Sequence, residues 1–63
     1  MKVKDIIDIL DEYTPLKVIV KSNVISFTKT YCMPKELNLI SELFIKKMYV
    51  YNDNLCLVVS EVE

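Results

Sequence analysis

The run Leu55-Cys56-Leu57-Val58-Val59 decides how this chain of 63 residues can fold. A strand with one face in water alternates apolar and polar side chains, whereas every side chain of this run is apolar. Both faces of the strand therefore need cover. A chain of this length has few elements with which to cover two faces of a sheet. We expect a second copy of the chain, or another protein, to supply the missing cover.

The residues before this run predict a helix followed by a hairpin. Apolar side chains recur at intervals of three and four residues over 3–13, which predicts an amphipathic helix that Thr14-Pro15 ends. Strands are expected over 16–21 and 24–30. A tight turn at Ser22-Asn23 joins them, with Asn23 in the left-handed conformation that asparagine tolerates best after glycine.

A second hairpin is expected in the C-terminal half. Pro34 favours the first position of a helix, so 34–37 is predicted to form a short helical turn. The stretch 39–45 fits either helix or strand. Strands are then expected over 46–51 and 55–62, joined by a three-residue loop, Asn52 to Asn54, with Asn54 left-handed.

These elements predict a single α+β domain that spans residues 1–63. Short connections favour pairing between consecutive strands, so the sheet is expected to be four-stranded and antiparallel, with two hairpins joined by a short helical turn. The N-terminal helix would pack on one face of the sheet. The other face would keep its own set of apolar side chains uncovered.

Composition argues against several classes of function. The chain has 8 basic and 9 acidic residues, so its net charge of −1 attracts neither nucleic acid nor an anionic membrane. The sequence contains no arginine, which argues against sequence-specific DNA binding. It also contains no histidine, the commonest general base and metal ligand. We therefore expect no enzyme activity, no cofactor and no metal site.

The cysteines and the apolar stretches predict where the protein resides. The start of the chain lacks the apolar region of a signal peptide, and no apolar stretch reaches transmembrane length. A reduced, cytoplasmic location follows, with Cys32 and Cys56 as free thiols. Cys56 belongs to the apolar run and is expected in the core, and Cys32 is expected to be structural because no base is available to activate it. Whether Cys32 and Cys56 lie close together stays open.

Two groups of polar residues are candidate binding sites. The first is an acidic set on the predicted helix, where like charges recur at unfavourable spacing and the last two oppose the helix dipole. Such a set fits a basic partner, or else a simple solvated face; it comprises Asp5, Asp8, Asp11 and Glu12. The second could bind an anionic ligand or nucleotide between subunits, or else consists of surface lysines and tyrosines that keep the sheet soluble; it comprises Lys35, Lys46, Lys47, Tyr49 and Tyr51.

Three segments carry a resemblance to known sequences: VKDIIDIL at 3–10, MPKEL at 33–37 and YVYNDNLCLVV at 49–59. With them the chain resembles short uncharacterised proteins of low-GC bacteria and their phages. The absence of Gly, Ala and Arg, whose codons are rich in G and C, agrees with an AT-rich coding genome. In size and composition the chain also resembles small phage anti-defence proteins, which block a host immune effector or sequester its signalling nucleotide.

The sequence therefore predicts a small, non-catalytic, phage-type binding protein. It would form a homo-oligomer and inhibit a host defence protein by direct binding. The alternative is an oligomeric sponge that sequesters a small anionic ligand or a signalling nucleotide between its subunits. A purely structural assembly subunit is a third possibility.

Overall fold

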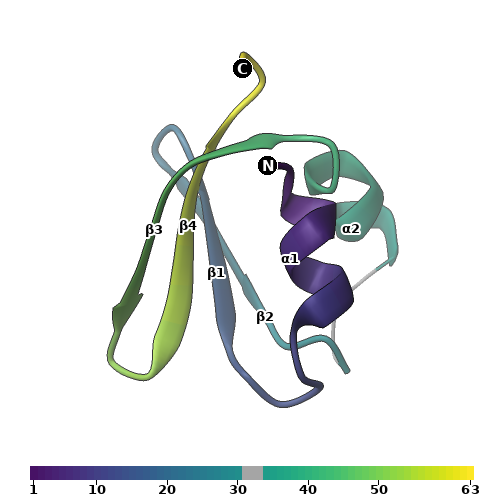
Figure 1. The fold of residues 1–63 in the computed structure, drawn as a ribbon, viewed down its shortest axis with the longest axis vertical. Coiled ribbons are helices and arrows are strands. Elements are labelled where there is room, and N and C mark those ends of the chain that lie inside the picture. The colour runs from purple at the N-terminus through teal and green to yellow at the C-terminus, as the bar shows by residue number, and fades with distance from the viewer. Residues whose placement is uncertain (31–33) are drawn as a thin grey trace.

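The computed structural model describes residues 1–30 and 34–63, and in these ranges it has two helices and four strands (Figure 1). The predicted α+β class is confirmed. In chain order the elements are α1 (Val3–Ile9), β1 (Leu16–Val20), β2 (Asn23–Phe27), α2 (Pro34–Ile40), β3 (Phe44–Tyr51) and β4 (Asn54–Ser60).

The predicted antiparallel sheet is wrong in one respect, because the sheet is mixed. The two hairpins, β1–β2 and β3–β4, are antiparallel as expected. They join through β1 and β4, which run parallel, so the strand order is β2-β1-β4-β3. The connection over residues 28–43 contains α2 and is long enough to carry the chain across the sheet. The last strand can therefore pair with the first.

The central position of β4 explains the unbroken apolar run. Neighbours on both sides hydrogen-bond this strand, with Leu57 opposite Val18 of β1 and Met48 of β3. Central strands of parallel pairs are buried on both faces and tend to be apolar throughout. Leu57 is fully buried and Cys56, which points to the other face, is only 3% exposed.

Both helices lie on the same side of the sheet (Figure 1). The core forms between them and the sheet, and it contains Val3 and Ile6 of α1 and Ile40 of α2. The strands contribute Leu16, Val18, Phe27, Leu57 and Val59. Burial of these apolar side chains is the main force that holds the domain together. Neither α1 nor α2 lies on the opposite side of the sheet.

Helix α1 is shorter than the sequence predicted. It ends at Ile9 instead of Tyr13, since Leu10 already has an extended backbone (φ −73°, ψ 142°). The Asp11 carboxylate accepts hydrogen bonds from the backbone N–H groups of Tyr13 (2.9 Å) and Thr14 (2.7 Å). A local bond of this kind gives the backbone an alternative to the helix. Tyr13, predicted to belong to the apolar stripe, is 77% exposed.

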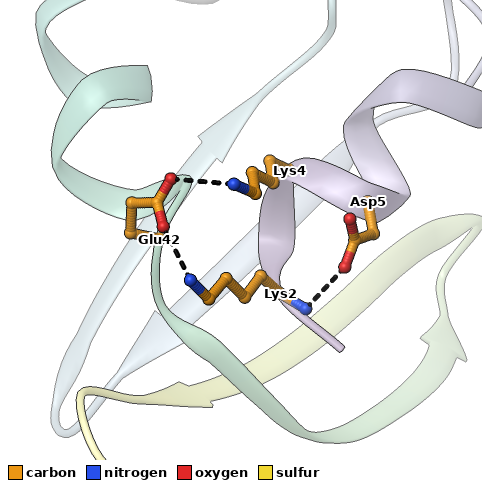
Figure 2. A network of polar contacts seen from close by, with 4 residues as sticks. All are labelled: Lys2, Lys4, Asp5 and Glu42. Carbon is orange, nitrogen blue, oxygen red and sulfur yellow. Dashed lines mark hydrogen bonds and ion pairs between the residues drawn. The ribbon is translucent and has the colours of Figure 1, made fainter.

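Backbone groups from elsewhere in the fold satisfy the start of α1. The N–H of Val3 donates to the carbonyl of Leu43 (3.0 Å), and that of Lys4 donates to Ser41 (3.0 Å). The Asp5 carboxylate accepts the backbone N–H of Lys2 at 3.0 Å (Figure 2). The first N–H groups of a helix have no partner within the helix, so these bonds fix α1 to the turn before β3.

Both hairpin loops differ from their prediction by one residue. Each is a two-residue loop: Lys21-Ser22 between β1 and β2, and Asn52-Asp53 between β3 and β4. Positive φ falls on Lys21 (56°), Asn52 (49°) and Asp53 (62°), whereas Asn23 and Asn54 already begin strands. Asn52-Asp53 has positive φ at both central residues, which is the pattern of a type I′ turn, whose twist matches that of the strands. In the Lys21-Ser22 loop only Lys21 has positive φ.

The ambiguous stretch 39–45 divides into three parts. Leu39 and Ile40 finish α2, residues 41–43 form a turn, and β3 begins at Phe44. The predicted short helical turn after Pro34 is thus a helix that continues to Ile40. The predictions for Cys32, including its distance from Cys56, lie outside the described residues.

Asp53→Gly is expected to stabilise the protein. A left-handed conformation costs an L-residue roughly 1–2 kcal/mol. Glycine removes that cost but loses roughly 0.5–1 kcal/mol in backbone entropy. The net gain in free energy of unfolding by urea should be about 0.5–1 kcal/mol, because Asn-Gly is a favoured type I′ pair. Asp53→Ala is the control and should destabilise, and a gain with alanine would contradict the turn assignment.

Candidate functional site

The side of the sheet away from the helices is the principal candidate surface. Side chains alternate along a strand, so Lys17 and Ile19 point away from the buried Leu16 and Val18. Residues that lie opposite one another on neighbouring strands have their side chains on the same face of the sheet. The partners of Lys17 and Ile19 across the four strands therefore complete this surface. We call this surface the open face; it comprises Lys17, Ile19, Val24, Ser26, Lys47, Tyr49, Tyr51, Asn54, Cys56 and Val58.

The open face has an apolar middle. Ile19 and Val58 lie side by side at its centre. Both are half-buried, although neither α1 nor α2 covers this face. Val24 flanks Ile19 and is 56% exposed. Contiguous apolar side chains that remain in water are typical of a surface that binds another protein.

The charge of the open face is positive. Lys47 lies opposite Val58 at the end of the apolar row, and Lys17 lies opposite Cys56 in the next row, so both amines adjoin the apolar middle. The Lys47 amine lies 5.9 Å from the centroid of the Tyr49 ring, within range of a cation–π contact. None of the members of the open face is a carboxylate. The face therefore suits an apolar surface that also carries acidic groups.

The structure separates the predicted acidic set. Asp5 and Asp8 lie on α1, but Asp11 and Glu12 lie beyond its end, so the set does not form one helix face. Asp11 is engaged within its own loop, where it also accepts the Thr14 hydroxyl at 2.7 Å. The helix-dipole argument for Asp11 and Glu12 is therefore wrong. Asp8 and Glu12 are exposed.

The loop that Asp11 organises is expected to weaken in acid. The hydrogen bond from the Thr14 hydroxyl, followed by those from the backbone N–H groups of Thr14 and Tyr13, lowers the pKa of Asp11 below its usual 3.8. A depressed folded-state pKa adds stability above the unfolded pKa, and that stability is lost as the pH falls through the folded value. The contribution of Asp11 is therefore complete at pH 6 and declines below about pH 3.8.

Urea unfolding of Asp11→Ala and of the parent at pH 6 and pH 3 tests this expectation. The difference in unfolding free energy between the two chains should shrink at the lower pH. Asp11→Asn keeps an acceptor oxygen without the charge, so its stability should change less with pH than that of the parent. Equal differences at both pH values would contradict the role of the carboxylate.

The second predicted set is also divided by the fold. Lys47, Tyr49 and Tyr51 share the open face, whereas Lys35 lies on α2, on the helix side. Lys46 lies at the bulge between Ile45 and Lys47, and its amine donates to the main-chain carbonyl of Glu63. A single ligand therefore cannot contact all of these residues in one copy.

Glu42 connects the turn after α2 to the start of α1. Its carboxylate lies 2.8 Å from the Lys2 amine and 3.1 Å from the Lys4 amine (Figure 2). The hydrogen bonds from Lys2 and then Lys4 lower the pKa of Glu42, and the bond to Glu42 raises the pKa of Lys2. Exposed pairs of this kind contribute little to stability. We assign this cluster to the positioning of α1.

Features of other kinds of site are not found in residues 1–30 and 34–63. These residues enclose no pocket, and none of their acidic and cysteine side chains gather into a group that could hold a metal ion. No helix in the same ranges is long and apolar enough to cross a membrane.

The sequence-based site predictions missed Lys17, Ile19, Val24 and Val58. Their signal was present, because the alternation of 17–20 places Ile19 opposite to Val18 and Val20. What the pattern could not supply was the parallel pairing that brings Ile19 beside Val58. Comparison of the chain with protein-family models, with curated proteins and with solved structures gave no match.

Proposed function

We propose that this chain is a non-catalytic protein-binding module whose open face contacts a partner protein. The observation that supports the proposal is the apolar middle formed by Ile19, Val24 and Val58, with two lysines, at 17 and 47, next to it. The partner it fits presents apolar side chains together with carboxylates. Occupying a host protein, such as a defence protein, is the role we propose for this contact.

The size of the open face limits how the partner binds. Four strands spaced about 4.8 Å apart and about six residues long give a projected area of roughly 400 Å². A standard protein interface buries about 800 Å² on each partner. The partner of one copy must therefore extend past the open face onto an adjoining edge of the sheet.

The experiment compares two exposed surfaces of the same chain. A tagged chain is used to capture proteins from the lysate of an AT-rich bacterium, and captured protein is quantified against bait. Ile19→Asp should abolish capture, because it places a carboxylate in the apolar middle of a basic face. Asp8→Lys reverses the charge at an exposed acidic position of α1 and should leave capture intact. Circular dichroism confirms that both variants fold.

The outcomes distinguish the open face from the acidic set. Capture that survives Ile19→Asp but is lost with Asp8→Lys would overturn the proposal in favour of the helix surface. A lysate that yields no stoichiometric protein would also count against it. Purified captured protein should then bind the parent chain in solution and fail to bind the Ile19→Asp chain.

Binding of a nucleotide by one copy is not favoured by this arrangement. A flat face without a pocket leaves a small ligand largely in solvent, and small-molecule sites are concave. Lys47 and the two tyrosines could act on such a ligand only if another copy closed over it. Calorimetry with cyclic and linear nucleotides tests this alternative, and saturable binding that Lys47→Glu abolishes would support it.

A further inference from the structure

Strand β3 lies at the edge of the sheet, and in Figure 1 most of it lies at the edge farthest from the helices. On its outer side the described part of the chain covers its start alone: Lys2 forms a bridge with Phe44, and the N–H of Ile45 donates to the carbonyl of Met1 (2.8 Å). Every residue from Lys46 to Tyr51 is exposed, including Met48 (52%) and Val50 (71%) on the helix side of the sheet. Natural proteins shield such edges because unpaired backbone groups recruit another strand. The bulge and the two lysines at 46 and 47 also protect the start of β3, whereas 48–51 carry no such protection.

The turn shows which backbone groups of β3 are unpaired. Tyr51 and Asn54 close a two-residue loop and so form a hydrogen-bonded pair of the ladder. Pairs alternate along the hairpin, so Tyr49 also directs its N–H and C=O toward β4. Met48 and Val50 direct theirs outward, where the described part of the chain offers no partner.

We propose that β3 pairs antiparallel with β3 of a second copy, about a two-fold axis at Tyr49, to form one eight-stranded sheet. This inference goes beyond the proposed contact with a partner protein. In this register Met48 lies opposite Val50 of the partner subunit, so the outward N–H and C=O groups meet each other. Lys47 lies opposite the tyrosine at position 51 of the other copy.

The other symmetric registers are less favourable. Residues whose N–H and C=O point outward must lie opposite residues of the same kind in the other copy. The two-fold axis must therefore pass through a residue and not between two residues. An axis at Met48 would pair across the bulge between Ile45 and Lys47. An axis at Lys47 would put two lysines face to face, and like charges directly opposite are destabilising. An axis at Val50 would shorten the paired segment.

Charge favours a second copy as the occupant of this edge. β3 carries Lys46 and Lys47 at its start and no carboxylate, while Asp53 lies in the turn at its other end. Antiparallel pairing about Tyr49 brings the lysines of each copy beside the turn of the other. The opposite edge strand, β2, is shorter and has Ser26 and Asn23 on it, so it is a poorer template.

Area also favours a second copy. Pairing through β3 sets the two open faces side by side in one sheet, which doubles the projected area to roughly 800 Å². The dimer thus offers a partner protein a continuous surface about twice as large as that of one copy.

A disulfide across the proposed axis provides the test. Residues of a non-hydrogen-bonded antiparallel pair have Cα atoms about 4.5 Å apart. This distance lies within the range that a disulfide accepts. Tyr49→Cys is made in a chain that also carries Cys32→Ser and Cys56→Val, because Cys56 is the cross-strand neighbour of position 49. Mild oxidation should convert this chain to a reducible dimer of twice the mass.

Two controls separate the proposed register from random collision. Val24→Cys, in the same background, is exposed on the open face at the β2 edge and should stay reduced under the same conditions. Tyr51→Cys faces position 47 of the other copy and should also fail to cross-link. Cross-linking at 51 in preference to 49 would overturn the register, and equal cross-linking at 24 and 49 would overturn the interface.

Sedimentation of chains without added cysteines tests the dimer independently. The parent chain should sediment as a dimer, and Val50→Pro should sediment as a monomer because proline removes an outward N–H. Met48→Lys gives a second variant with the same expected loss. A parent chain that stays monomeric when concentrated would overturn the proposal. Ile19→Asp lies two strands away from β3 and should keep the dimer, so failure of partner binding and failure of dimerisation are distinguishable.

Discussion

Val18→Asp is expected to prevent folding of the chain. Val18 is fully buried at the centre of β1, between the helices and the sheet. Burying an unpaired carboxylate costs several kcal/mol even after the protein relaxes. At about 0.05–0.15 kcal/mol per residue, the whole domain has only roughly 3–9 kcal/mol of stability. The variant should lack the far-ultraviolet circular dichroism of the parent and show no cooperative unfolding transition.

Ile19→Asp is the matched control for this prediction. The same carboxylate is placed one residue further along β1, but on the open face, where Ile19 is only half-buried and water can reach it. This variant should fold with nearly the stability of the parent chain. If Ile19→Asp unfolded the chain and Val18→Asp did not, the assignment of the two faces of the sheet would be inverted.

Leu57→Ala is expected to have the second largest effect. Leu57 is fully buried in β4, and its neighbours on the core face belong to β1 and β3. Removing a buried leucine side chain costs about 2–5 kcal/mol, because transfer energy is lost and a cavity remains. Urea titration should show a midpoint far below that of the parent, or an unfolded population before denaturant is added.

The control for Leu57→Ala changes the same residue type at an exposed position. Leu39 lies on α2 and is 71% exposed, so Leu39→Ala removes little buried area. Its midpoint should stay within the error of the parent value. A comparable loss at Leu39 would indicate that α2 is covered by something that the structure of one copy does not include, such as a second copy.

The sequence alone predicted those helices and strands that a pattern of neighbouring side chains identifies. The alternation around Val18 and Ile19, and the unbroken run from Leu55 to Val59, predicted strands that the structure contains. The run also indicated that its strand needs cover on both faces. β4 meets that need in part by lying between two other strands, where the side chains of neighbours shield Cys56 on the open face.

The errors came from interactions that a linear pattern does not contain. The parallel pairing of β1 with β4 depends on contacts between residues about forty positions apart. The early end of α1 depends on Asp11, because its carboxylate accepts backbone N–H groups that would otherwise donate to carbonyls within the helix. Both loops were displaced by one residue because, without glycine, several polar residues were equal candidates for positive φ.

The candidate site was harder to predict than the fold. Charge alone singled out the acidic set, yet Asp11 serves its own loop. The surface that we propose instead is assembled from two or three side chains of each strand, and no strand reveals it alone. Only the register identified Ile19 and Val58 as neighbours.

The place of β4 in the strand order has a consequence for how the protein is made. The last of the four strands in chain order lies in the interior of the sheet, next to the first. The nascent chain can form the first hairpin early, but it cannot assemble the sheet until residue 60 has left the ribosome. Until that moment the unfinished hydrophobic surface is exposed to chaperones and proteases.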